Sequence, residues 1–198
     1  MKKKIILASN NVGKITEVEE ILTNYDILSQ EQAGIRTEVV EDGSTFEENA
    51  VKKAKEIARL TGRPCIADDS GLCIDFLDGF PGVYTKRFLG EEVTDKDRNE
   101  DILKRLHEIP HEFRRAHFVC CIALALPNGQ SFPFEKSLDG YISTARRGNK
   151  GFGFDEIFEL ENGKTLAEIS QREKLTISSR RVALEALNEF ILRKRIVL

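Results

Sequence analysis

The sequence predicts an α/β fold formed by a single domain that spans residues 1–198. Two observations support this prediction. Short apolar runs of strand length alternate with segments in which apolar residues recur at helical spacing. The chain has 198 residues, of which 40% are hydrophobic, so it can bury one substantial core with room for two lobes.

The N-terminal segment predicts a strand, a polar loop and a helix in that order. Residues 5–8 are apolar, residues 9–14 are mostly polar, and apolar side chains then recur at helical spacing as far as Leu22. A second helix is expected to begin at the capping-box pattern of residues 44–47 and to end at Gly62. Four polar residues are expected on the outside of its first turns: Glu48, Asn49, Lys52 and Lys53.

Two adjacent carboxylates, Asp68 and Asp69, lie between the apolar runs 65–67 and 72–74. We interpret the runs as buried strands and residues 68–71 as a tight turn, because serine and glycine favour a sharp reversal. Two carboxylates so close repel each other by roughly 1 kcal/mol or more. A divalent metal ion would relieve the repulsion; the alternative is an Asp-rich turn that is simply solvated.

The remainder of the chain alternates in the same way. Further elements are expected: a loop over residues 79–88, a helix from Thr94 to about Glu108, a hairpin of strands 118–126 and 131–137, and a C-terminal amphipathic helix from Ser178 or Ser179.

Composition and charge exclude several classes of protein. The net charge is −3 and no long basic tract is present, so we expect small-molecule partners and no nucleic acid. The four cysteines form no C-x-x-C pair, which indicates free thiols and neither a zinc site nor a disulfide framework. The first apolar run has only four residues, too few for a signal peptide or a membrane span. A cytoplasmic protein is therefore expected.

The polar loop of residues 9–14 is a candidate phosphate site. It contains Ser9, Asn10, Asn11 and Lys14 and precedes a helix, where backbone N–H groups and the helix dipole favour anions. The loop lacks the first glycine and the Lys-Ser/Thr ending of a P-loop. Asn11 as a plain helix cap is the alternative.

Three carboxylates are candidate metal ligands: Glu41, Asp68 and Asp69. Mg²⁺ prefers oxygen ligands from a few carboxylates, water and substrate phosphates, and Mn²⁺ often substitutes. Such an ion would neutralise a triphosphate and acidify a bound water, with one carboxylate as general base. We assign that role to Asp69; Glu41 as an ordinary loop anion is the alternative.

Residues 146–155 form a candidate ligand loop, because they combine three glycines, three cations and two phenylalanines. The ring of Phe152 or Phe154 could stack on a base while Asp155 accepts N–H protons from it, which suits purine recognition. The alternative places both rings in the core and makes Asp155 a turn former. Four residues near the last helix could complete the pocket or serve as caps and surface charge: Lys174, Ser178, Ser179 and Arg180.

Taken together, the motifs closely resemble those of the inosine triphosphate pyrophosphatase family, in the same order and over nearly the whole chain. They are Ser9-Asn10-Asn11-x-x-Lys14, Glu41-Asp42-Gly43-x-Thr45-Phe46-x-Glu48-Asn49-Ala50, Ala67-Asp68-Asp69-Ser70-Gly71-Leu72, Phe80-Pro81-Gly82-Val83-Tyr84, Gly151-Phe152-Gly153-Phe154-Asp155 and Ser178-Ser179-Arg180.

The resemblance implies a two-lobed, elongated mixed β-sheet flanked by helices, with the active site in the cleft between the lobes and two chains in a homodimer. It implies an Mg²⁺-dependent hydrolase that converts ITP, dITP and XTP to the nucleoside monophosphate and pyrophosphate. Such an enzyme removes aberrant purines from the nucleotide pool before polymerases incorporate them.

The resemblance also implies residue roles. Phosphate ligands would be Ser9, Asn10, Asn11, Lys14 and Lys53. Metal ligands would be Glu41 and Asp69, with Asp69 also the general base. The rest of the nucleotide would be bound by Ser70, Phe152, Gly153, Phe154, Asp155, Lys174, Ser179 and Arg180. Within this last set, Phe152 is expected to stack on the purine, and Asp155 and Arg180 are expected to read its edge.

Two positions depart from the family pattern: Glu156 stands where proline is usual, and Ser179 where histidine is usual. Both lie in the base-reading region, so a relaxed or shifted base preference is one alternative. Others are a nucleotide-binding sensor without turnover, a phosphomonoesterase with an aspartyl intermediate, and a single-stranded nucleic-acid binder, which would need a longer basic track. The preferred purine, the preferred sugar and the dimer geometry stay open.

Overall fold

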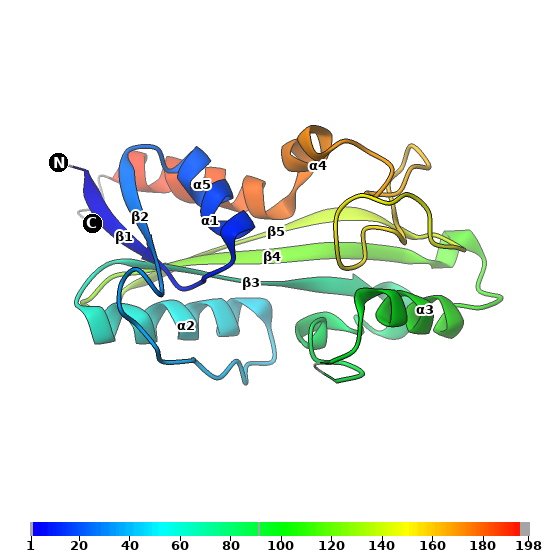
Figure 1. Cartoon of the computed structure of the whole chain (residues 1–198), viewed down its shortest axis with the longest axis horizontal. Helices are drawn as coiled ribbons and strands as arrows, with labels where there is room; N and C mark the ends of the chain where they lie inside the picture. Colours follow the sequence, from blue (N-terminus) through cyan, green and yellow to red (C-terminus); the bar gives the residue numbers. More distant parts are fainter. Residues whose placement is uncertain (1, 91, 195–198) are drawn as a thin grey trace. The chain divides into compact units, whose positions relative to one another are not determined.

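The computed structural model describes residues 2–90 and 92–194 and shows a mixed α/β fold (Figure 1). Its strands are β1 Lys3–Leu7, β2 Tyr25–Ser29, β3 Cys65–Ile74, β4 Arg115–Ala125, β5 Ser131–Ile142 and β6 Phe158–Glu159. Its α-helices are α1 Val12–Ile21, α2 Phe46–Thr61, α3 Asp95–Arg105, α4 Gln171–Ile177 and α5 Ser179–Lys194. The predicted α/β class is confirmed.

The six strands form one mixed sheet in the order β2-β1-β3-β4-β5-β6. Strand β1 is parallel to both β2 and β3, whereas β5 and β6 are antiparallel. The chain divides into two compact units. Unit 1 comprises Met1–Asp69, Cys120–Lys136 and Arg180–Leu198, and unit 2 comprises Ser70–Val119 and Ser137–Ser179. Strands β3, β4 and β5 contribute residues to both units.

In unit 1, helices α1 and α5 cover one face of the sheet and α2 covers the other (Figure 1). The core on the α1 and α5 side includes Leu7, Val18, Ile66 and Leu187, all buried. Helix α2 buries Phe46 and a row of small or branched side chains that includes Ala50, Ala54 and Ile57. Side chains on the two faces of β3 therefore meet different helices.

The ends of α2 follow the predicted signals, with one shift. Thr45, not Ser44, is the N-cap: its hydroxyl accepts a hydrogen bond from the Glu48 N–H at 3.1 Å. The Glu48 carboxylate accepts a hydrogen bond of 2.7 Å from the N–H of Ser44, the residue before the cap, and not from that of Thr45. The cap therefore lies one residue later than predicted, and the reciprocal contact of a capping box is not formed. Gly62 ends the helix in the left-handed conformation, with φ 64°.

The prediction of a tight turn at residues 68–71 is wrong. The whole segment Cys65–Ile74 is one continuous strand between β1 and β4, and no residue from 68 to 71 has positive φ. β1 pairs with this strand at Cys65 and Ile66, and β4 is its other neighbour in the sheet. Pairing within the sheet outweighs the turn preference of serine and glycine. Because successive side chains of a strand point to opposite faces, Asp68 and Asp69 point away from each other.

Unit 2 has its own core, which includes Leu72, Ile102, Phe154 and Phe158. Helix α3 begins at the predicted cap, where Thr94 and Asp97 form a complete capping box. It ends at Arg105, before the predicted Glu108, whose φ of 66° is incompatible with a helix.

The predicted hairpin and C-terminal helix are also present, as β4 with β5 and as α5. Residue pattern alone did not indicate β2, β6 or α4, which are all short. None of the four cysteines forms a disulfide bond. Within the described residues, no helix combines the length and apolarity needed to cross a bilayer.

Candidate active site

In the predicted polar loop of residues 9–14, residues 9–11 join β1 to α1, and Lys14 lies in the first turn of the helix. This segment is tied together by its own side chains. Asn11 is the N-cap of α1: its Oδ1 accepts a hydrogen bond from the Lys14 N–H at 3.1 Å. The Ser9 hydroxyl accepts one from the Asn11 N–H at 3.1 Å. Asn11 is thus a helix cap, and the N-terminus of α1 that it orders is a region of positive potential suited to phosphate.

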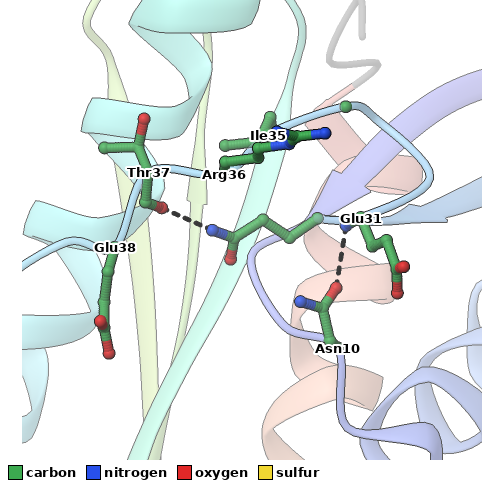
Figure 2. Close-up of a pocket in the computed structure, with 8 residues that line it drawn as sticks. Asn10, Glu31, Ile35, Arg36, Thr37 and Glu38 are labelled. Atoms are coloured by element: carbon green, nitrogen blue, oxygen red, sulfur yellow. Dashed lines mark hydrogen bonds between the residues drawn. The ribbon is translucent and has the colours of Figure 1, made fainter.

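Asn10 points toward a different segment. Its Oδ1 accepts a hydrogen bond from the Glu31 N–H at 2.8 Å, which fastens the loop to the connection after β2 (Figure 2). Asn10 also lines an open pocket of about 670 Å³. The other residues that line it are Gln30, Glu31, Gly34, Ile35, Arg36, Thr37 and Glu38. The side-chain oxygen of Asn10 is therefore used for positioning.

Asp68 is buried, with 3% exposure, and binds two cations on the α1 and α5 face of the sheet. Its Oδ2 lies 2.8 Å from the Lys14 ammonium and 3.2 Å from Nη2 of Arg180. Arg180 also contacts Glu17, at 3.4 Å. Burial by itself would raise the pKa of Asp68, but the charges of Lys14 and Arg180 outweigh it and hold that pKa well below its usual value. Asp68 is thus a charged anchor for both cations at neutral pH.

Asp69 contacts α2 on the opposite face. Its Oδ2 accepts a hydrogen bond of 2.9 Å from the side-chain amide of Asn49. Asn49 is buried at 1% exposure, so its predicted place on the outside of the helix is wrong. Its Oδ1 accepts a hydrogen bond from the Gly43 N–H at 2.7 Å, and a Cβ at Gly43 would lie the same 2.7 Å from that oxygen. Glycine at position 43 therefore leaves room for the amide that orients Asp69.

Glu41 is bound one helical turn further along α2. Its carboxylate forms an ion pair with Lys53, and both side chains are partly buried. Lys53 and Asn49 stand four residues apart and so share one face of the helix. Asp69 and Glu41 are each held by this same face. The neighbouring Lys52 instead pairs with the exposed Asp42, at 2.6 Å.

These contacts bear on the metal prediction. Among residues 2–90 and 92–194, no three acidic, histidine or cysteine side chains converge as a metal-binding group. Mg²⁺ is commonly held by one or two carboxylates together with water and substrate phosphates, so Glu41 and Asp69 would suffice. Asp68 faces away from Asp69 and binds two cations already, so the structure does not support the prediction that it is a metal ligand.

In unit 2, Asp155 holds the loop Gly151–Asp155 together. It is buried, and its Oδ2 accepts a hydrogen bond from the Phe152 N–H at 2.9 Å and pairs with the Lys174 ammonium. A Cβ at Gly151 would lie only 1.9 Å from the same oxygen, and Gly151 has φ 78°. Only glycine fits there. Asp155 thus joins the loop to α4.

The two phenylalanines of this loop have different surroundings. Phe152 is 74% exposed, and the Lys174 ammonium lies 4.5 Å from the centre of its ring. Phe154 is 4% exposed and stacks on Phe88, with ring centres 6.1 Å apart. The expectation that Phe154 offers a ring to a ligand is therefore wrong, because that ring belongs to the core. Phe152 has the accessible ring.

The remaining predicted residues are distributed over both units. Ser70 lies on β3 in unit 2, and Ser179 is the first residue of α5 and is nearly buried. Arg180 belongs to unit 1, where it contacts Asp68 and Glu17. Glu156, at a position where the sequence departs from the family pattern, forms an ion pair of 2.5 Å with Arg146.

A model of the Ham1 family matches residues 5–190. The chain belongs to the Ham1 family.

The relatives agree with this assignment. The chain is 43% identical to the dITP/XTP pyrophosphatase of Geobacter sulfurreducens over 191 residues, which cover 95% of this chain and 96% of that protein. It is 45% identical to the dITP/XTP pyrophosphatase of Leuconostoc mesenteroides over 192 residues, which cover 94% and 95%. The solved structure of the Staphylococcus aureus Ham1 protein superposes with a TM-score of 0.91 at 37% identity and covers 97% of this chain and 100% of that one. The family expected from the motifs is confirmed.

Three contacts in this Ham1 protein involve residues to which the sequence pattern assigns no site role. Asn49 orients Asp69, and on α3 Asp95 and Asn99 bind Gly153. Asn49 lies inside the motif of residues 41–50 and four residues before Lys53, a spacing that could have indicated it. Asp95 and Asn99 have the same spacing, but no motif surrounds them.

Proposed function

We propose that this Ham1 protein hydrolyses dITP, XTP and ITP to the nucleoside monophosphate and pyrophosphate. The observation that carries the proposal is the arrangement on α2, where Asn49 and Lys53 hold Asp69 and Glu41 along one helix face. It supplies a general base, a second carboxylate and a cation for a phosphate chain. The dITP/XTP pyrophosphatases to which the chain is similar are named for this reaction.

The triphosphate would be bound by the loop of residues 9–14 and by the two lysines Lys14 and Lys53. N–H groups at the start of α1 would donate to phosphate oxygens, and each ammonium would neutralise part of the charge. Mg²⁺, or Mn²⁺ in its place, would add further neutralisation and lower the pKa of a bound water. Glu41 and Asp69 would hold the ion, and Lys53 would then turn from Glu41 to the phosphates.

Asp69 would accept the proton of the water that attacks phosphorus. Positioned bases of this kind contribute about 10²–10⁴-fold to rate. The Asn49 amide donates a hydrogen bond to one oxygen of the Asp69 carboxylate, and this contact orients the group. Asp68 would keep Lys14 and Arg180 in place and take no part in the proton transfer.

The purine would stack on Phe152, whose ring is exposed. Lys174 would donate a hydrogen bond to a 6-keto oxygen, and Asp155 would accept an N–H. A 6-amino purine would present a donor to Lys174 and leave a buried polar group unpaired, which can separate substrates by factors of about 10⁴. Ser70, Ser179 and Arg180 complete the proposed pocket. The cleft, the homodimer and the cytoplasmic location stay predictions.

The test is product analysis over dITP, XTP, ITP, GTP, dATP and ATP with Mg²⁺, scoring pyrophosphate and orthophosphate separately. We expect pyrophosphate from dITP, XTP and ITP, little from the 6-amino purines dATP and ATP, and loss of turnover with EDTA. Orthophosphate would indicate a phosphomonoesterase. Equal rates for all purines would indicate a relaxed base pocket, and binding without any product would indicate a sensor.

A further inference from the structure

The first two turns of α3 bind Gly153 through both of its backbone polar groups. The Asp95 carboxylate accepts a hydrogen bond from the Gly153 N–H at 2.7 Å, and the Asn99 amide donates one of 3.1 Å to the Gly153 carbonyl. Asp95 and Asn99 are four residues apart and so project from one face of the helix. Gly153 is held from both sides by a helix distant in sequence.

Gly153 lies between two rings with opposite surroundings. Phe154 is anchored in the core against Phe88, and Phe152 is exposed. Gly153 itself has φ 63° and no side chain that could pack. Glycine of this kind moves easily between conformations, so the direction of the Phe152 ring depends on what holds the Gly153 backbone.

Asn99 has a feature that stability alone does not explain. It is 1% exposed, and within the described part of the chain its Oδ1 has no hydrogen-bond partner. A buried acceptor without a partner costs free energy, and an apolar side chain with the same branching, such as leucine, would avoid that cost. The benefit of the amide at this position is its hydrogen bond to the Gly153 carbonyl.

Arg98, which precedes Asn99 on α3, holds the segment that contains Phe88. Arg98 is buried and donates hydrogen bonds to four backbone carbonyls: those of Lys86, Phe88, Gly90 and Val93. The ring of Phe88 stacks on Phe154. Helix α3 therefore fixes both the backbone of the Gly151–Asp155 loop and the ring against which that loop is anchored.

We propose that Asp95 and Asn99 are positioning residues that set the selectivity of this enzyme for 6-keto purines by fixing the direction of the Phe152 ring. The proposal rests on the proposed function, in which Phe152 stacks on the purine. A base on a fixed ring meets Lys174 and Asp155 in one register, so a keto oxygen and an amino group are told apart. If the ring can change direction, the stacked base can contact Lys174 and Asp155 in several orientations, and both 6-keto and 6-amino purines are accepted.

The test compares three substitutions for kcat and KM with dITP and dATP and for thermal unfolding. Asn99→Leu removes the donor to Gly153 and also the unpaired oxygen. Asp95→Ala removes the carboxylate that accepts the hydrogen bond from the Gly153 N–H. Because Asp95 is exposed, this variant should fold even if Asn99→Leu does not, and it then tests the same anchoring of Gly153. Asp97→Ala is the matched control, because Asp97 only caps α3 through Thr94.

For Asn99→Leu and Asp95→Ala, the ratio of kcat/KM for dITP to that for dATP should fall about 10-fold or more, since small misplacements are costly. The change should lie in KM for dITP, with kcat nearly preserved, and Asn99→Leu should unfold no earlier than the wild type. Asp95→Asn keeps an acceptor oxygen and should restore the ratio. Asp97→Ala should lower the unfolding temperature and leave the ratio unchanged.

The outcomes separate this inference from the proposed function. If the wild type prefers dITP and both Asn99→Leu and Asp95→Ala prefer it equally, the inference is wrong and the proposed function stands. If Asp97→Ala lowers the ratio as much as they do, general loosening of α3 explains the effect and the inference is also wrong. If the wild type makes no pyrophosphate, both the proposed function and the inference are overturned. If it releases pyrophosphate from dITP and dATP equally well, the inference is wrong and the pyrophosphatase reaction stands with a relaxed base pocket.

Discussion

Asp68 and Asp69 are neighbours in sequence, yet their carboxylates lie on opposite faces of β3. Asp68 binds Lys14 and Arg180 on one face, and Asp69 accepts a hydrogen bond from Asn49 of α2 on the other. The strand thereby separates a charged anchor from a candidate general base.

Asp68→Asn should destabilise the protein by about 3 kcal/mol or more, because removal of one partner of a buried ion pair leaves the other charge uncompensated. Two cations, Lys14 and Arg180, lose their common anion in this variant. Urea unfolding measures the effect. Asp69→Asn is the matched control and should cost much less, since an amide can still accept the hydrogen bond from Asn49. Equal losses in the two variants would contradict the assignment of Asp68 as the anchor.

The contribution of Asp68 to stability should depend on pH in one direction. Its pKa in the folded protein is lowered from the ordinary value of 3.8, so the carboxylate binds a proton more readily in the unfolded chain. The stabilisation is therefore complete above about pH 5 and is lost as the pH falls below 3.8 toward the lower folded value. The gap in unfolding free energy between wild type and Asp68→Asn should stay constant from pH 8 to about pH 5 and narrow below about pH 4. If the difference in unfolding free energy between the two proteins narrowed already between neutral pH and about pH 5, the lowered pKa of Asp68 would be contradicted.

Lys53 and Lys52 are adjacent on α2 but should differ in importance. Lys53 is partly buried beside Glu41, whereas Lys52 pairs with the exposed Asp42. Lys53→Met should lower kcat/KM for dITP roughly 100-fold, the usual effect of losing one charge-stabilising donor. Lys52→Met should change it by about twofold or less, because exposed pairs contribute little. Steady-state kinetics with dITP measure both variants. A larger loss of kcat/KM in Lys52→Met than in Lys53→Met would contradict the assignment of Lys53 as the lysine that binds phosphate.

Phe152 and Phe154 provide a second matched pair. Phe152→Ala should alter the unfolding free energy by no more than about 0.5 kcal/mol, as is usual for exposed side chains, and should raise KM for dITP about 10-fold through lost base stacking. Phe154→Ala should instead cost about 3–5 kcal/mol, the usual result of emptying a core aromatic site. Thermal or urea unfolding together with KM values test both. An unchanged KM in Phe152→Ala would remove this ring from the proposed purine site.

The sequence could predict those features that depend on neighbouring residues. The caps of α3 at Thr94 and Asp97, the end of α2 at Gly62 and the turn at Gly129 all rest on local chemistry. The turn predicted at residues 68–71 is absent for a long-range reason. These residues belong to β3, which lies in the sheet between β1 and β4, and the pairing of strands distant in sequence cannot be predicted from residues 68–71 alone.

In the candidate site, too, the sequence could predict what depends on neighbouring residues but not what depends on distant ones. Residue types identified the loop of residues 151–155 but could not distinguish the exposed ring of Phe152 from the buried ring of Phe154. The contacts of Asn49 with Asp69 and of Asn99 with Gly153 join residues 20 and 54 positions apart. Such contacts depend on how the helices pack. The motif around Asn49 could have indicated that residue, but no local pattern indicates its partner or the contact of Asn99 with Gly153.

The most direct measurement is the kcat for pyrophosphate release from dITP by Asp69→Asn, at saturating dITP and Mg²⁺, beside the wild type and Asp68→Asn. If Asp69 is the general base, its variant should lose at least about 100-fold in kcat while still binding the nucleotide. Asp68→Asn, assayed at a temperature at which it is folded, should lose about tenfold or less, because Asp68 acts only through Lys14 and Arg180. An active Asp69→Asn enzyme, or a greater loss in Asp68→Asn, would contradict the division of roles between the two faces of β3.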